Sequence, residues 1–254
     1  MRPRVALLTC LLVVVAGCAA PTGETGPPPG LSADGVTDAN ALVRAHTDAL
    51  QSQSFTVRST MTMRPTNGSF RVVSNRTWRV DPGDPIRGRV VSSRRAVGDA
   101  PAAYAAGPTR VAAWRNGTTT YRRVDRNGTP AYGRVPLFDS PVKLNGALQR
   151  TALYRLSARR SATVEPVERD GRRLYRVTAA LNDTAVSSNA SMTLLVDTNG
   201  VVRTLKTERQ VQYRSGKRDI STTVHVTRVG STTVERPEWY GAAAAATGNG
   251  TAER

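Results

Sequence analysis

Long segments of alternating apolar and polar residues, joined by very short turns, dominate the last third of this 254-residue chain. They cover about 190–197, 201–214 and 218–229, and the turns between them are Thr198-Asn199-Gly200 and Ser215-Gly216. A period of two places successive side chains on opposite faces of a strand, and turns this tight join only antiparallel neighbours. The segment therefore predicts an antiparallel meander with one packed face and one solvated face.

The same period of two recurs upstream, interrupted by two segments of helical period. Further strands are expected over about 54–63, 70–80, 86–97, 109–116, 119–126, 162–169 and 172–182. A helix is expected to run to about Gln51, capped by Thr37 or Asp38, because its apolar residues recur at three- and four-residue spacing. Leu144 to Arg159 offer a second helix. The expected fold class is α+β, with an antiparallel sheet of about ten strands packed on one or two helices.

The first seventeen residues have the pattern of a signal peptide, with Arg2 and Arg4 preceding an apolar run. That run, Val5 to Val15, would cover about 17 Å as a helix, roughly half of a bilayer's hydrocarbon core. Val15-Ala16-Gly17-Cys18 matches a lipobox, in which cleavage leaves Cys18 as the lipidated first residue of the mature protein, its thiol carrying a diacylglycerol. We predict lipidation at Cys18, with acyl chains such as palmitate holding the protein at the extracytoplasmic face of the cell membrane. The alternative is an ordinary secretory signal with an incidental cysteine.

Composition divides the rest of the chain into three parts. Residues 18–30 are rich in proline and glycine, which favours an extended tether behind the anchor. Residues 31–241 are long enough for one domain with a sizeable core. Residues 242–254 mix alanine, glycine and charge, and we expect a disordered tail there.

Seven of the ten asparagines lie in Asn-x-Ser/Thr sequons, an excess that favours a glycosylated surface protein. The candidate sites are Asn67, Asn75, Asn116, Asn182 and Asn189. The other two sequons are at Asn127, where Pro130 follows at once, and at Asn249. The alternative is that Asn-Gly-Thr serves as hairpin-turn sequence.

The chain is strongly basic, at +17, and arginines outnumber lysines 33 to 3. The arginines are scattered along the expected strands, as on a solvated outer sheet face. Without aromatic stacking platforms or a known motif, we expect no nucleic-acid partner. An anionic membrane surface is the favoured electrostatic partner.

No pattern in the sequence indicates catalysis, and we expect no enzyme activity, cofactor or metal. His46 lies on the first expected helix and His225 on a strand, with no nearby cluster of metal-ligand spacing. There is no nucleophile elbow and no phosphate-binding glycine loop. The carboxylates lie mostly at expected turns.

Two stretches of the sequence resemble a known family. Leu31 to Asp38, with the helix after it and the strand opening at Ser54-Phe55-Thr56-Val57, resembles the start of uncharacterised haloarchaeal surface lipoproteins, and Thr232 to Tyr240 resembles their end. Such proteins are similar to the lipoprotein carriers of the LolA/LppX/LprG-like superfamily. The resemblance implies a curved, unclosed half-barrel wrapped round a helix, with an apolar cavity for the acyl chains of a lipid or lipoprotein.

Apolar residues on the expected strands provide candidates for lining such a cavity. They are Phe55, Val57, Met61, Met63, Phe70, Val72, Trp78, Val177, Leu181, Leu205, Val211, Tyr213, Val224 and Val226. The methionines suit varied apolar ligands. The alternative is that these residues only pack as core against the helix.

Two functions follow. The first is a membrane-anchored, non-enzymatic lipoprotein that binds or carries a lipid or acyl chains between sheet and helix. The second is a surface protein that engages polyanions or protein partners through an arginine-rich sheet face. A continuous apolar tunnel beneath residues 39–51 would favour the first, and a filled core the second.

Overall fold

The computed structural model describes residues 26–105, 109–136 and 142–248. The predicted signal peptide, Cys18, Asn249 and most of the predicted tether lie outside the described residues. None of the helices in the described part is long and apolar enough to cross a bilayer.

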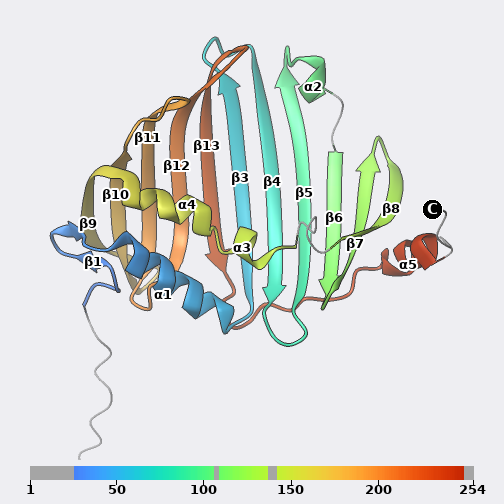
Figure 1. Cartoon of the computed structure of the whole chain (residues 1–254), viewed down its shortest axis with the longest axis horizontal. Coiled ribbons are helices and arrows are strands. Elements are labelled where there is room, and N and C mark those ends of the chain that lie inside the picture. The colour runs from blue at the N-terminus through green and yellow to red at the C-terminus, as the bar shows by residue number, and fades with distance from the viewer. Residues whose placement is uncertain (1–25, 106–108, 137–141, 249–254) are drawn as a thin grey trace, which may run out of the picture.

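Within these ranges, eleven antiparallel strands form one open sheet in the order β8-β7-β6-β5-β4-β3-β13-β12-β11-β10-β9 (Figure 1). Their bounds are β3 Phe55–Pro65, β4 Phe70–Asp81, β5 Arg87–Gly98, β6 Thr109–Asn116, β7 Thr119–Arg126, β8 Thr129–Val135, β9 Arg159–Arg169, β10 Arg172–Leu181, β11 Ser187–Asp197, β12 Val202–Tyr213 and β13 Gly216–Thr227. Two meanders, β3 to β8 and β9 to β13, are joined where β3 pairs with β13. The open half-barrel is thus confirmed, although the chain is richer in sheet than an even α+β mixture.

The sheet has an inner face, which the helices cover in part, and an outer face on the opposite side. The helices α1 (Ala39–Gln51), α3 (Leu144–Ala147) and α4 (Arg150–Tyr154) and the 3-10 turn η2 (Arg155–Ala158) cross the lower half of the inner face (Figure 1). The remaining short elements are β1 (Leu31–Ser32), β2 (Gly35–Val36), α2 (Ala102–Ala105) and α5 (Tyr240–Gly248). The upper half of the inner face carries none of the three helices.

Helix α1 forms as its sequence predicts. Asp38 is the N-cap, and its side chain accepts hydrogen bonds from the backbone N–H groups of Asn40 (2.8 Å) and Ala41 (3.1 Å). The apolar stripe that includes Leu42, Val43 and Leu50 is buried against the sheet. The main core therefore lies between these helices and the inner faces of the strands.

Two elements differ from the sequence-based expectation. Strand β8 was not expected. It contains Pro130 and Gly133, which disfavour a central strand, and the sheet tolerates them because β8 is an edge strand. The opposite edge strand, β9, likewise contains Pro166. The single helix expected over 144–159 is divided into α3, α4 and η2, because Gln149 has a left-handed backbone (φ 53°).

The C-terminal segment packs on the outer face, where residues 242–248 form part of α5 instead of the expected disordered tail. Alanine is the strongest helix former, and Ala243 is buried against Trp114 of β6. Tyr240 lies edge-on between Trp114 and Tyr121, with ring centroids 5.1 Å apart in each pair. Apolar packing of this helix on the sheet is what orders the segment. Residues 249–254 lie outside the described residues.

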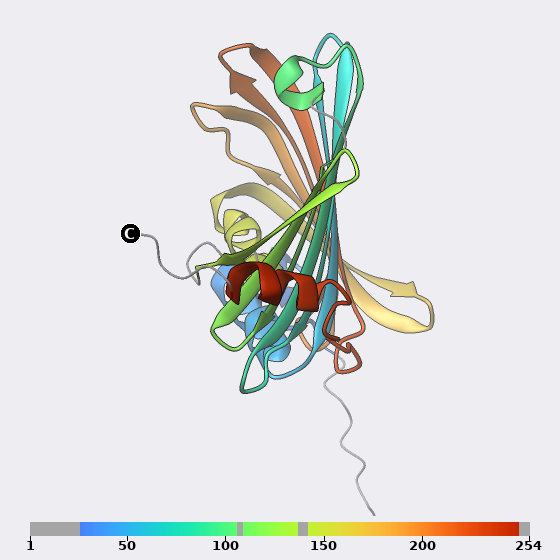
Figure 2. The same ribbon diagram turned by 90° about the vertical axis from the view of Figure 1, so that its right-hand side faces the viewer.

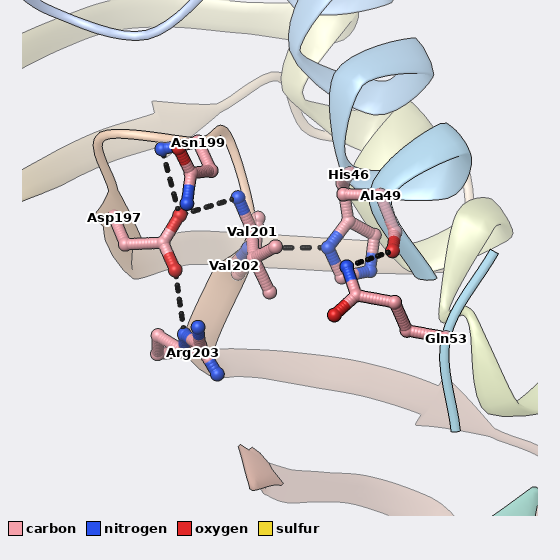
Figure 3. A network of polar contacts seen from close by, with 8 residues as sticks. All are labelled: His46, Ala49, Gln53, Asp197, Asn199, Val201, Val202 and Arg203. Atoms are coloured by element: carbon pink, nitrogen blue, oxygen red, sulfur yellow. Dashed lines mark hydrogen bonds and ion pairs between the residues drawn. The ribbon is translucent and has the colours of Figure 1, made fainter. Parts of the chain in front are cut away.

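A buried histidine connects α1 to the elements on either side of it. His46 Nδ1 accepts the backbone N–H of Val202 in β12 (3.1 Å, Figure 3). Its Nε2 lies 3.1 Å from the Leu148 carbonyl after α3. The first bond requires an unprotonated Nδ1, so Nε2 carries the proton and donates it to the Leu148 carbonyl. Burial, the largest effect, lowers the pKa of His46 from 6.5 to about 4. The imidazole is therefore neutral in the folded chain at neutral pH.

We expect His46 to make the fold acid-sensitive. In the unfolded chain it takes a proton near pH 6.5 and in the folded chain only near pH 4, so the free energy of unfolding should fall by about 3 kcal/mol between these values. Denaturant unfolding across this pH range measures the fall. His46→Gln should remove this part of the pH dependence, whereas the control His225→Gln, at an exposed histidine, should keep it. An unchanged slope in His46→Gln would contradict the assignment.

Candidate binding groove

The predicted cavity residues fall into two apolar clusters on the inner face. Phe55, Val57, Trp78, Val177, Leu181, Leu205, Val224 and Val226 belong to the main core under the helices. Met63, Phe70 and Val72 are buried in a second cluster in the upper half, with Met61 and Val211 packed against it, and Tyr213 is exposed. The sequence thus placed these residues on the correct face of the sheet; whether they line a ligand site stays a prediction.

Helix α1 fills the space in which the carrier hypothesis predicts an apolar tunnel. Between it and the sheet the void measures about 10 Å³, lined by residues that include His46, Leu205 and Val224. A void of this size holds at most about one water molecule. Beneath α1 the structure therefore has a filled core, with no room for an acyl chain.

An open groove lies instead along the edge of α3 and α4, where the helices meet the uncovered half of the inner face. It has two parts, of about 500 Å³ and about 320 Å³, which share Gly146, Gln149 and Thr222 in their lining. Volumes of this order are typical of small-molecule sites. We call this feature the inner groove. It is much larger than the void beneath α1.

The lining of the inner groove combines apolar and cationic side chains. Its apolar lining includes Met61, Trp78, Val111, Ala152 and Leu205, and its arginines are Arg76, Arg94, Arg155 and Arg209. The Arg76 guanidinium lies over the ring of Trp78, 5.3 Å from the centroid. Serines and threonines supply most of the remaining lining. Such a surface suits a ligand that is apolar over part of its length and anionic at one end.

Two arginines of the groove face each other without a counter-ion. Arg155 comes from η2 and Arg209 from β12, and both are half-buried. Burial and then the charge of Arg209 lower the pKa of Arg155. Neither guanidinium has a hydrogen bond or ion pair to any residue that the structure describes. Two like charges held together in a partly dry site favour binding of an anion between them.

The sequence analysis did not select these arginines, although a signal for them exists. Arg209 continues the apolar phase of β12, two residues before Val211, and Arg76 stands in the same relation to Trp78 in β4. A cation in phase with buried residues must lie on the packed face of the sheet. The prediction that the arginines lie on a solvated outer face is therefore wrong for Arg209 and Arg76, whose phase matches that of buried residues.

Above the groove, in the second apolar cluster, lies a buried arginine surrounded by aromatic rings. Arg218 is buried, with its guanidinium 4.8 Å from the ring centroid of Tyr213 and 5.2 Å from that of Tyr104. It also donates to Ser215 Oγ (2.8 Å) and to the Tyr104 hydroxyl. Because hydrogen bonds and aromatic rings already surround its guanidinium, we assign Arg218 a structural role in the second apolar cluster.

The remaining expected site residues are placed as follows. Asn67, Asn75, Asn116, Asn182 and Asn189 are all exposed, as a glycan requires, and their occupancy stays a prediction. Asn189 has a left-handed backbone (φ 51°), the conformation that asparagine tolerates in turns and bulges. In the described ranges no group of three His, Cys, Asp or Glu side chains could hold a metal ion.

Comparisons with known proteins show no family. No family model and no curated protein matches the chain. Solved structures resemble it weakly: a DUF1329 family protein from Desulfovibrio piger has 10% identity and a TM-score of 0.27, covering 82% of this chain and 97% of its own. The MucA/MucB complex of Pseudomonas aeruginosa has 14% identity and a TM-score of 0.35, covering 78% of this chain and 59% of its own.

A third likeness is to a putative outer membrane lipoprotein-sorting protein domain from Vibrio parahaemolyticus, with 8% identity and a TM-score of 0.25. It covers 79% of this chain and 96% of the other. The comparisons give no support for a haloarchaeal origin. TM-scores this low assign no function, and we take none from them.

We expect removal of a groove arginine to leave the fold intact. In Arg155→Gln and in Arg209→Gln the free energy of unfolding should stay within about 0.5 kcal/mol of the parent value, because neither guanidinium has a partner to lose. The contrasting control is Arg203→Gln, which breaks the 2.7 Å ion pair to Asp197 and should cost about 1 kcal/mol. Urea unfolding measures all three. A large loss in either groove variant would mean that its arginine has a structural role.

Proposed function

We propose that this chain is a membrane-anchored extracytoplasmic lipoprotein that binds an anionic amphiphile, such as a lysophospholipid or a fatty acid, in the inner groove. The acyl part would lie along the apolar lining around Met61, Trp78 and Leu205. The acidic group would lie between Arg155 and Arg209. The filled core beneath α1 argues against an acyl-chain tunnel there and by itself favours the surface-interaction alternative. The proposal keeps a ligand-binding role by placing the site at the edge of α3 and α4 instead.

The unpaired arginines beside an apolar lining carry the proposal. An apolar ligand alone would gain nothing from Arg155 and Arg209, and a small inorganic anion would gain nothing from Trp78 and Leu205. A molecule with both parts uses the whole groove. The groove is open along the uncovered half of the inner face, which would let a long ligand enter and leave sideways.

The proposed mechanism is binding without covalent chemistry. The groove brings together no pair of acid and base groups: its charged side chains are arginines, which hold their protons at every physiological pH. It could therefore orient and shield an amphiphile, and the proposed role is to hold or pass on that molecule at the membrane surface.

Binding should depend on the charge of the ligand and on the arginine pair. The parent chain is expected to bind lysophosphatidylglycerol at least about tenfold more tightly than lysophosphatidylcholine of the same acyl length. In Arg155→Gln/Arg209→Gln this preference should disappear, since each charge-assisted contact is worth about 1.5 kcal/mol or more. Native mass spectrometry and tryptophan fluorescence titration measure both ligands. Equal binding of the two lipids by the parent chain would exclude the charge-selective site.

A matched pair of glycine variants tests the location. A Cβ added at Gly146, which lines both parts of the groove, meets no atom within 4 Å, so Gly146→Trp should fold with its ring directed into open space and obstruct the groove. Gly241 in α5 is equally unobstructed and lies on the outer face, so Gly241→Trp is the control. Lysophosphatidylglycerol binding should fall in the first variant and persist in the second. Equal binding by both would place the site elsewhere.

Anchoring is tested separately, on Cys18. Expressed in a host that processes lipoproteins, the parent chain should partition with membranes and yield an N-terminal peptide whose mass includes a diacylglycerol and begins at residue 18. Cys18→Ser should lack that mass and be recovered mainly in the soluble fraction after a high-salt wash. A Cys18→Ser chain that is processed and retained identically would show that the cysteine is incidental.

A further inference from the structure

A second, strongly basic pocket lies on the outer face of the sheet, at the end where α1 crosses the inner face. It has a volume of about 790 Å³ and is bordered by the β9–β10 turn, the β11–β12 turn and the end of β13. Six arginines line it: Arg58, Arg169, Arg172, Arg173, Arg203 and Arg228. The hairpin of β9 and β10 supplies three of these arginines, and it projects from the lower right in Figure 2. We call this feature the basic pocket.

Most of the charge in the basic pocket is uncompensated. Asp197 is held by the backbone N–H groups of Asn199 (3.1 Å) and Val201 (2.9 Å) and by Arg203 Nε (2.7 Å), as Figure 3 shows. The Asp197 carboxylate thus already binds the turn backbone and one arginine. The other carboxylate of the lining is Asp170, so six arginines against two aspartates leave four positive charges.

Among the described residues, all the pocket arginines except Arg203 lack a carboxylate partner, and four of these five converge from distant parts of the chain. Arg58 is in β3, Arg169 and Arg172 flank the β9–β10 turn, and Arg228 follows β13. None of these four has an ion pair to a residue that the structure describes. Their guanidinium groups surround a lining that includes Leu174 and Leu195, both buried. Apolar surroundings strengthen the attraction of these charges for an anion.

The position of the predicted tether brings this end of the sheet close to the anchor. The first described residues, 26–30, lie at the lower end of the molecule in both views (Figures 1 and 2). Pro28 is buried there, and its carbonyl accepts the N–H of Leu31 (3.0 Å), which fixes where the tether leaves the domain. Eight residues lead from Cys18 to Gly26 and can span at most about 28 Å. A lipid on Cys18 would hold the lower end of the domain within that distance of the bilayer.

We propose that the basic pocket docks on the phosphate groups of anionic phospholipids in the membrane that carries the Cys18 anchor. The inference rests on the anchoring part of the proposed function and not on the inner groove. Guanidinium groups form bidentate hydrogen bonds to phosphate, and four unpaired ones can engage more than one headgroup. Docking through the outer face would leave the inner groove, on the opposite face, open to its ligand.

Vesicle binding of a chain that has no acyl anchor tests this inference. The full chain with Cys18→Ser is titrated with phosphatidylcholine vesicles and with vesicles containing about one quarter phosphatidylglycerol. Residues 5–15 are present in every variant, so their contribution cancels in the ratio of the two affinities. The unsubstituted pocket is expected to favour the anionic vesicles, and Arg169→Gln/Arg172→Gln should reduce that preference by about 30-fold.

A charge-matched control separates the pocket from general attraction of a basic protein. Arg95→Gln/Arg110→Gln removes two exposed arginines from β5 and β6, also on the outer face and several strands away. Its preference should stay within about threefold of that of the parent, because surface charges beyond a Debye length, about 8 Å at physiological salt, contribute little. A second pocket variant, Arg58→Gln/Arg228→Gln, should behave like the first.

Three results would overturn the inference. One is an equal loss in the pocket and control variants, which would indicate diffuse attraction. The second is an absence of preference for anionic vesicles in the parent chain. The third is saturable binding of inorganic phosphate by the pocket without vesicle binding, which would assign it to a soluble anion. None of these results bears on lysophospholipid binding in the inner groove or on the mass of the Cys18 peptide, so the tests fail independently.

Discussion

Pairing of β3 with β13 is the interaction on which the rest of the structure depends. Ten residue pairs, from Thr56–Thr227 to Pro65–Arg218, join two meanders that would otherwise be separate sheets. The pairing makes one curved surface wide enough for α1, α3 and α4 to pack on, and it places Arg58 of β3 beside the end of β13. The core, the inner groove and the basic pocket all include residues from both meanders.

The alternation of side chains along the strands then separates two chemistries onto two faces. Where inner-facing residues are apolar, the helices cover them and the space is filled. Where the same phase supplies Arg76, Arg94 and Arg209, the helices stop and a groove remains, since burying these cations without partners would cost several kcal/mol. On the outer face α5 covers the apolar cluster around Trp114, and the rest of that face can carry a high density of arginine in water. One sheet thus carries a groove of mixed apolar and cationic lining on one face and a basic pocket on the other.

Much of the fold could be predicted from the sequence, and the site only in part. Strand period and turn residues identified ten of the strands, because both signals are local. Strand β8 was missed because Pro130 excludes only central strands, and edge position is a tertiary property. The break at Gln149 was missed since an amphipathic pattern does not report a left-handed residue. The pairing of Arg155 with Arg209 depends on how η2 lies over β12, which no local pattern contains.

The prolines of the two edge strands affect whether neighbouring copies of the protein can pair edge to edge. An unclosed sheet presents two rows of unpaired backbone groups, each a template for a strand of another copy. Lipid anchoring would hold many copies in one plane, where their edges meet often. Pro130 in β8 and Pro166 in β9 each remove a backbone donor from the row, so a ladder between neighbouring copies would be interrupted at either edge. The sheet can therefore remain unclosed without pairing edge to edge with another copy of itself.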